Sequence, residues 1–273
     1  MKEYIEIIRP SIVFMSALGV ITGAIISKAD ILFTLIASIS AFFIAGAGIV
    51  VNDIYDYETD KINFPNRPLP SKRMKKRNAA FYSIILFALG ISLSYLINIY
   101  CFFLAFLNTI LEVIYARNTK RMALIGNVFD SWFVASTFIF GYLASLNNFF
   151  IIKESFAPIL LVSLLAFISN MGREIFGDIE DIKGDKKAGM KTLPIITSEK
   201  FARKVASIFI ILAIALSPLP FLFGFFSVAY LLIVFVADIL FLYSLFQEPR
   251  KNQKMTKIAM LLALLAFLFG SIF

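Results

Sequence analysis

The sequence predicts an all-α membrane protein with nine transmembrane helices. Of its 273 residues, 60% are hydrophobic and only 16% are charged, and the mean hydropathy is +0.86. A soluble domain is closer to half apolar, with about 25% charged residues. Apolar runs long enough to cross a hydrocarbon core, about 20 residues of helix, recur along the whole chain.

The apolar runs divide the chain into nine predicted spans and leave a single domain, residues 1–273. The spans are 10–27, 31–52, 79–97, 99–116, 123–145, 155–177, 202–219, 224–246 and 257–273. The first is not a signal peptide, because Glu3 and Glu6 precede it, no clear small-residue cleavage site follows, and eight more spans come after it. The opening "MKEYIEIIRP" alternates apolar and charged residues and favours a short interfacial helix.

The basic residues predict the orientation of these spans. All lysines and arginines except Lys28 and Lys153 fall at the N-terminus, in loops after even-numbered spans or at the span ends next to these loops. By the positive-inside rule the N-terminus and these loops are cytoplasmic, and the C-terminus, after an odd number of spans, is outside. The two long polar loops, 53–78 and 178–201, are both cytoplasmic in this arrangement. We therefore expect the functional site on the cytoplasmic side of the cell membrane.

The histidine and cysteine content limits the chemistry. The chain has no histidine and one cysteine, Cys101, which lies in an apolar stretch and is predicted to be a small buried residue. Disulfides within the chain, Cys/His zinc sites, axial-histidine haem and histidine acid–base catalysis are excluded. Any metal here is a hard cation held by oxygen ligands.

Two acidic clusters each end a predicted span on the cytoplasmic side. In "NDIYDYETD" and "REIFGDIEDIKGD" the polar residues recur every three or four positions and share a helix face if the spans continue as helices. Opposed carboxylates repel in a low dielectric, so a cation is expected between them. Lysine or arginine side chains are one possibility; carboxylate and amide oxygens also suit Mg²⁺. The clusters comprise Asn52, Asp53, Asp56 and Asp60, and Glu174, Asp178, Asp181 and Asp185.

A solvated helix rim is the simpler interpretation of either acidic cluster alone. The repetition of Asp-x-x-x-Asp at both span ends, on the same side, favours a shared site instead. Arg67 lies between Pro65 and Pro68 in a stiff segment and is predicted to bind phosphate. The basic run at 72–77 is typical of membrane anchoring. Acids for a metal and bases for phosphate together indicate a diphosphate ligand.

Three further residues are weaker candidates. Asp130, in "GNVFD" with Asn127, and Asp238 lie within predicted spans, where ionisable residues are costly. Asp130 is close enough to the cytoplasmic end of its span to line a cavity, whereas Asp238 has no predicted partner. Tyr115 lies five residues before Lys120 and is predicted to point toward a substrate.

The two acidic motifs resemble those of the UbiA superfamily of intramembrane prenyltransferases. "NDIYDYETD" matches the pattern N-D-x-x-D-x-x-x-D, with "NRPLPS" just after it, and "DIKGD" supplies the second Asp-x-x-x-Asp before "KKAGMKTLP". "DYETDKINFPNRPLPS" and "REIFGDIEDIKGDKKAGMKTLPI" are most similar to the archaeal digeranylgeranylglyceryl phosphate synthases. One departure is Lys72, because similar proteins commonly have glycine after the Pro-Ser pair.

The resemblance implies a helical bundle around a central cavity and a role for each matching residue. Two Mg²⁺ ions bridging the diphosphate would be held by Asn52, Asp56, Asp60, Asp181 and Asp185. Asp53 and Asp178 would support these ligands, and one of them would take the acceptor proton. Arg67 and Lys120 would bind phosphate oxygens, and Tyr115 would lie near the reacting allylic carbon.

The implied reaction is the transfer of a geranylgeranyl group from geranylgeranyl diphosphate to the free hydroxyl of geranylgeranylglyceryl phosphate. This forms the second ether bond of archaeal membrane lipids. A phosphorylated acceptor explains additional bases, for which Arg117, Arg121 and Arg173 are candidates. No protein partner and no nucleic acid is expected.

Two alternatives are compatible with parts of the pattern. The first is a prenyltransferase with an aromatic acceptor, of the quinone-precursor or chlorin/tocopherol type, which needs no second phosphate site. The second is a cation transporter that uses the acids as an ion site. Transporters usually bind their ions near the bilayer midplane, whereas these acids lie at span ends.

Overall fold

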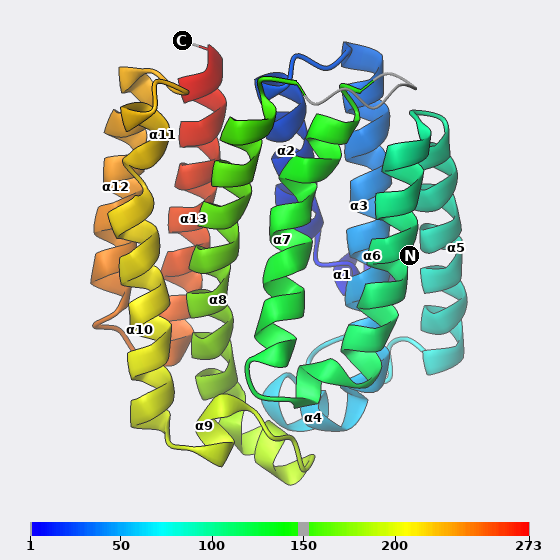
Figure 1. The fold of residues 1–273 in the computed structure, drawn as a ribbon. Helices are drawn as coiled ribbons and strands as arrows, with labels where there is room; N and C mark the ends of the chain where they lie inside the picture. The colour runs from blue at the N-terminus through cyan, green and yellow to red at the C-terminus, as the bar shows by residue number, and fades with distance from the viewer. Residues whose placement is uncertain (1, 147–152, 273) are drawn as a thin grey trace.

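The computed structural model describes residues 2–146 and 153–272, and over these residues the chain is a bundle of helices (Figure 1). No strand occurs in this part of the chain. The helices are α1 Lys2–Ile7, α2 Pro10–Ile26, α3 Ile31–Tyr55, α4 Tyr57–Asn63, α5 Lys76–Tyr95, α6 Ile99–Arg117, η1 Thr119–Arg121, α7 Ile125–Leu143, α8 Phe156–Lys187, α9 Leu193–Ile196, α10 Glu199–Leu216, α11 Leu219–Leu222, α12 Val228–Ser244 and α13 Pro249–Ile272.

A helix lies at each of the nine predicted ranges. By length and composition, six segments of the described chain qualify as membrane spans: α3, α5, α6, α8, α10 together with α11, and α13. The helices α2 and α12 are apolar but shorter, and α7 carries Asn127 and Asp130 near its start. These long apolar helices indicate a multi-pass membrane protein.

Three predicted boundaries are wrong at the end of the bundle where α4 and α9 lie. The range 178–201 is not a loop throughout, because α8 continues as one helix to Lys187. The last helix begins at Pro249 rather than 257. The second span continues to Tyr55, and after Asp56 the chain forms the separate short helix α4. The polar residues at these ends are therefore held on helices rather than in loops.

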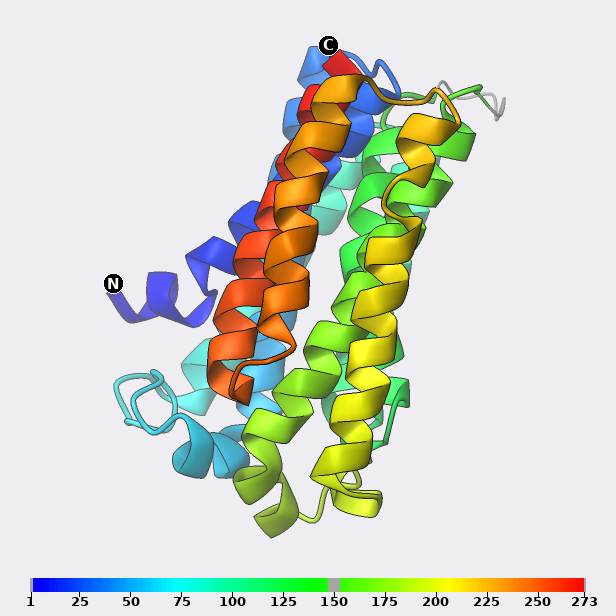
Figure 2. The same cartoon turned by 90° about the vertical axis from the view of Figure 1, so that its left-hand side faces the viewer.

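Close helix packing in the interior depends on small residues. The helices α2 and α7 cross at Gly23 and Gly141, where an added Cβ would lie 2.3 Å from the Phe138 carbonyl oxygen and 2.2 Å from that of Val20. Such small residues let two backbones approach each other within a membrane. The side views show α10 and α12 on one side of the bundle and α5 and α6 on the other (Figures 1 and 2).

The segment around the first acidic cluster is less regular than the rest. The short helix α1 projects from the side of the bundle, and the loop between α4 and α5 lies below it (Figure 2). Arg73 in this loop donates two hydrogen bonds to Glu6, at 2.5 and 2.7 Å. Lys72 has a φ of 61°, in the left-handed region that favours glycine. Cys101 is buried and free, as predicted.

Candidate active site

A cavity of about 450 Å³ lies in the centre of the bundle. Its lining comes from every long helix of the described chain except α5, and includes α4. The inner part is lined mostly by apolar side chains such as Phe133, Leu264 and Phe267. The acids of both clusters except Asp53 also line it, as do five basic side chains. One cavity therefore combines an apolar volume with a strongly charged region.

The first acidic cluster keeps its shared face across a break in the helix. Asp56 lies between α3 and α4, yet its amide donates to the Asn52 carbonyl at 2.8 Å, and the Asp60 amide donates to the Asp56 carbonyl at 2.7 Å. Helical hydrogen bonding thus continues through the break. Asn52, Asp56 and Asp60 all line the cavity, as the four-residue spacing predicts.

The second cluster lies on the uninterrupted helix α8. Glu174, Asp178, Asp181 and Asp185 all line the same cavity as the first cluster. Asp178 accepts a hydrogen bond from the Asn127 amide at 3.0 Å. Within the described chain, the side chains of Asp181 and Asp185 form no hydrogen bond or ion pair.

Contacts at two places connect the segments around the clusters. One joins α4 to α8, and the other joins the loop that carries Lys120 to the loop after α8. The Asn63 side chain of α4 donates to the Asp181 carbonyl and accepts from the Gly184 amide, both at 3.2 Å. An isolated parallel β-bridge pairs Met122 with Lys191, and the Lys191 amide donates to the Arg121 carbonyl at 2.9 Å. Segments far apart in sequence therefore form one continuous wall at this end of the cavity.

The predicted phosphate ligands Arg67 and Lys120 both line the cavity and both pair with the first cluster. Arg67 donates to Asp60 at 2.7 Å, and Lys120 forms an ion pair with Asp56. Burial raises the pKa of Asp60 even though the Arg67 guanidinium opposes this. Burial alone would lower the pKa of Lys120, but the Asp56 carboxylate and its hydrogen bond more than offset burial and raise that pKa. Lys120 is therefore a cation at neutral pH.

Tyr115 lines the cavity beside both clusters. It is 5% exposed, and its ring packs against Phe129 and Phe133, with centroids 6.5 and 5.9 Å away. The carboxylates of Asp56 and Asp178 both act electrostatically on its hydroxyl. Tyr115 thus lies where the charged and the aromatic parts of the cavity meet.

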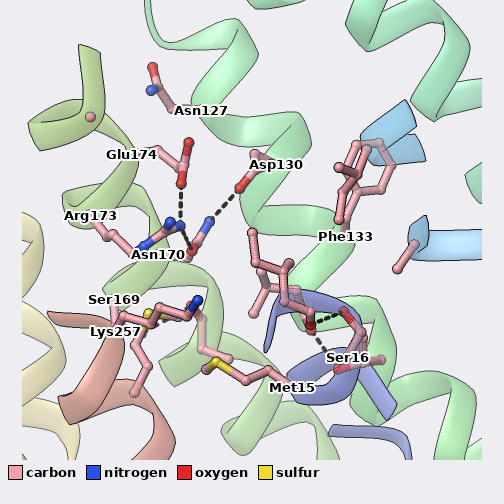
Figure 3. Close-up of a pocket in the computed structure, with 18 of the residues that line it drawn as sticks. Met15, Ser16, Asn127, Asp130, Phe133, Ser169, Asn170, Arg173, Glu174 and Lys257 are labelled. Atoms are coloured by element: carbon pink, nitrogen blue, oxygen red, sulfur yellow. Dashed lines mark hydrogen bonds and ion pairs between the residues drawn. The ribbon is translucent and has the colours of Figure 1, made fainter. Parts of the chain in front are cut away.

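A second polar group lies deeper in the cavity, between α7 and α8 (Figure 3). The Asn170 amide donates to Asp130 at 3.0 Å, and Arg173 donates to the Asn170 side-chain oxygen at 3.3 Å. Arg173 also forms an ion pair with Glu174. Asp130 therefore lines the cavity as predicted, with a partner that the sequence did not indicate. Asp238 also lines the cavity and accepts a hydrogen bond from Ser217 at 2.6 Å.

The structure does not bring every candidate to the cavity. Asp53 is 1% exposed, forms an ion pair with Arg9, and lies 3.8 Å from Arg67, so its carboxylate supports these bases behind the lining. Arg117 and Arg121 are exposed, and neither lines the cavity. Of the three bases considered for a second phosphate, only Arg173 lines the cavity.

Three residues that line the cavity were not predicted as site residues: Arg9, Asn63 and Lys257. Arg9 directly precedes Pro10 and adopts a φ of 49°, a backbone conformation that L residues rarely take. Asn63, in "INFPNRP", ends α4 and contacts α8. Lys257 lies about two turns inside α13, which the sequence did not indicate because the predicted span began too late, at 257.

The donor set fits a hard divalent cation. The side-chain oxygens Asn52 Oδ1 and Asp60 Oδ2 are buried without a hydrogen-bond partner, and Asp181 and Asp185 face the same cavity. Buried oxygens without partners are costly, and a bound cation would satisfy them. In the described chain no three acids lie close enough together to form a metal-binding group, and Arg67 and Lys120 pair with two of the carboxylates.

Comparison with protein families matches residues 12–270 to the UbiA prenyltransferase family. A protein from Methanosphaera stadtmanae named digeranylgeranylglyceryl phosphate synthase is 38% identical over 280 residues, and the alignment covers 100% of both chains.

Solved structures give the same family relationship. One, described as a digeranylgeranylglyceryl phosphate synthase in membranes, is 37% identical with a TM-score of 0.75, covering 99% of this chain and 98% of the other. A UbiA homologue from Archaeoglobus fulgidus bound to DMAPP and Mg²⁺ is 18% identical, with a TM-score of 0.69 over 99% of this chain and 100% of the other. This last likeness shows the fold alone.

Proposed function

The chain belongs to the UbiA prenyltransferase family, and from this premise we propose a specific reaction for this membrane prenyltransferase. It transfers a geranylgeranyl group from geranylgeranyl diphosphate to the free hydroxyl of geranylgeranylglyceryl phosphate, and so forms the second ether bond of archaeal membrane lipids. The observation that carries this proposal is that both acidic clusters, with Arg67 and Lys120, line one largely apolar cavity. Full-length relatives with the corresponding name support the choice of substrates.

The membrane arrangement is part of the same proposal. Residues 1–273 form a single domain with nine transmembrane helices, a cytoplasmic N-terminus and the C-terminus outside. The distribution of lysines and arginines supports this orientation. The charged region of the cavity then faces the cytoplasm, where a water-soluble diphosphate group is accessible.

We assign the metal ligands to the side chains that line the cavity from its two walls. Asn52, Asp56 and Asp60 would hold Mg²⁺ from the α3–α4 wall, and Asp181 and Asp185 would hold it from α8. When bound, Mg²⁺ neutralises the charge that grows on the departing diphosphate. Arg67 and Lys120, which pair with Asp60 and Asp56 here, would then be free to bind phosphate oxygens. In the present structure, the proposed diphosphate ligands Arg67 and Lys120 are therefore held in ion pairs with two proposed metal ligands.

The chain then protects the reacting allylic centre and activates the acceptor. The aromatic rings of Tyr115 and Phe133 line the space beside the diphosphate ligands, with Phe129 packed against Tyr115, and exclude the water that would trap a carbocation-like centre. The acceptor oxygen attacks this carbon while its proton passes to a carboxylate. Of the two carboxylates considered for that role, Asp178 lines the cavity and Asp53 does not, so we assign the role to Asp178.

The test uses purified protein in detergent with geranylgeranyl diphosphate, Mg²⁺ and either geranylgeranylglyceryl phosphate or 4-hydroxybenzoate. Diphosphate release is followed, and the lipid product is identified by mass. We expect Mg²⁺-dependent diether formation that Asp56→Ala and Asp181→Ala both abolish and that Arg117→Gln, at an exposed site outside the cavity, retains. If product forms only from 4-hydroxybenzoate, the proposed acceptor is wrong. If neither acceptor gives diphosphate release, the proposed reaction is wrong.

A further inference from the structure

Five basic side chains line the cavity, and one of them differs from the rest. Arg9, Arg67, Lys120 and Arg173 each form an ion pair, with Asp53, Asp60, Asp56 and Glu174 respectively. Lys257 contacts no carboxylate within residues 2–146 and 153–272. Its ammonium group donates instead to the Ser11 hydroxyl, at 2.7 Å.

Contacts between α8 and α13 place Lys257 on the same side of the cavity as Arg173. Gln253, one turn before Lys257 and on the same face of α13, donates its side-chain amide to the Arg173 carbonyl. Both Arg9 and Arg173 are close enough to Lys257 to repel its charge. Figure 3 shows Arg173 beside Asn170 and Lys257 below them. Three cations thus converge where α2, α8 and α13 meet.

A half-buried ammonium without a counter-ion, repelled by two guanidinium groups, is energetically unfavourable in an apolar helix. Lysines at helix ends often avoid this cost by extending toward the membrane surface. Lys257 instead lines the central cavity and bonds to a hydroxyl within the protein. The ammonium group of Lys257 therefore lacks an anionic partner on the side that faces the cavity.

We propose that Lys257 and Arg173, with Arg9 beside them, form a second anion subsite that takes the phosphate monoester of a lipid acceptor. The inference rests on the proposed function, in which the diphosphate is bound by Arg67, Lys120 and the acidic clusters. In a glycerol phosphate the free hydroxyl next to the other ether is two carbons from the phosphate. A phosphate at Arg173 therefore keeps this hydroxyl in the polar part of the cavity, near Asn170 and Asp130.

The experiment measures steady-state kinetics of the purified full-length protein with geranylgeranylglyceryl phosphate and with its dephosphorylated counterpart, geranylgeranylglycerol. Lys257→Gln is expected to raise the KM for the phosphorylated acceptor about 10- to 100-fold, as loss of a charged hydrogen bond does. The KM for geranylgeranyl diphosphate and the turnover of the neutral acceptor stay unchanged. Lys257→Arg restores most of the affinity. Lys254→Gln, an exposed position one turn earlier in α13, is the matched control and leaves all constants unchanged.

Direct binding of the phosphorylated acceptor and of inorganic phosphate is measured on the same variants. Weaker lipid binding in Lys257→Gln supports the subsite even if the wild-type protein makes no diether, which would overturn only the proposed reaction. Equal KM and equal binding in Lys257→Gln and wild type would overturn the subsite. If inorganic phosphate binds as tightly as the lipid, the site belongs to free phosphate and the lipid assignment is wrong.

Discussion

The two acidic clusters share the Asp-x-x-x-Asp spacing but differ in what surrounds them. The first lies where a helix breaks between α3 and α4, and Arg67 and Lys120 pair with its carboxylates. The second lies on the continuous helix α8, and Asp181 and Asp185 have no partner within the described chain. The protein itself pairs the carboxylates of Asp56 and Asp60 with bases, whereas those of Asp181 and Asp185 are left open to a cation from outside.

Removal of the metal gives the largest expected effect. Chelation with EDTA is expected to abolish prenyl transfer, because the charge of the second cluster and of the leaving diphosphate is then unbalanced. Added Mg²⁺ restores transfer and raises the apparent melting temperature, since a ligand that binds only the folded state stabilises it. The increase is measured in detergent by thermal unfolding. If Mg²⁺ raises the melting temperature of the Asp181→Asn, Asp185→Asn double variant as much as that of the wild type, the proposed difference between the two clusters is wrong.

Neutralising one acid in each cluster is expected to change metal-free stability in opposite directions. Asp60→Asn removes the nearer of the two buried carboxylates beside Arg67, and we expect a loss of about 1–3 kcal/mol. Asp181→Asn removes a carboxylate that has no ion-pair partner and that Asp185 repels more strongly than Lys120 attracts it, and we expect a gain of about 0.5 kcal/mol. Thermal unfolding of both variants in EDTA checks the pair. Equal losses would mean that the two clusters are neutralised alike.

Asn63 joins the two regions, and its loss is expected to have an intermediate effect. Asn63→Ala removes two hydrogen bonds to the backbone of α8, each of which typically contributes about 1 kcal/mol. The Mg²⁺ concentration for half-maximal activity should rise about tenfold, because the walls that hold the ligands are no longer fastened together. Asn66→Ala, in the following loop, serves as the control. A Mg²⁺ requirement unchanged by Asn63→Ala would mean that α4 and α8 are aligned by other contacts.

The smallest expected effect concerns the loop after the first cluster. Lys72 holds a left-handed backbone conformation, which costs an L residue about 1 kcal/mol and glycine almost nothing. Lys72→Gly is therefore expected to raise stability slightly, by less than this amount because glycine also adds disorder to the unfolded chain. Activity should stay unchanged. A measured loss of stability would show that the lysine side chain stabilises the loop.

The sequence predicted the features that depend on periodicity. The helices at all nine ranges follow from apolar runs, and the shared faces of Asn52, Asp56 and Asp60 and of Asp181 and Asp185 follow from four-residue spacing. The extension of α8 to Lys187 was missed because its polar composition is typical of a loop, while α4 and the β-bridge hold it in place.

The contacts between segments far apart along the chain could not be predicted from the sequence. The ion pair of Asp53 with Arg9, the Asn127–Asp178 bond and the position of Lys257 depend on which helices are neighbours in space. Spacing along one helix carries no information on these pairs. For this reason Asp53 was counted with the cavity acids, although it lies behind them, and Arg117 was counted with the phosphate ligands, although it is exposed.

The bridge between Met122 and Lys191 also limits how this enzyme can be recombined with its relatives. The loop that carries Lys120 and the loop after α8 share a backbone pairing, so the length and shape of one determine the place available to the other. A chimera that takes only one of these loops from a relative would shift Lys120 away from Asp56. Loop exchange should therefore succeed only when both are transplanted together.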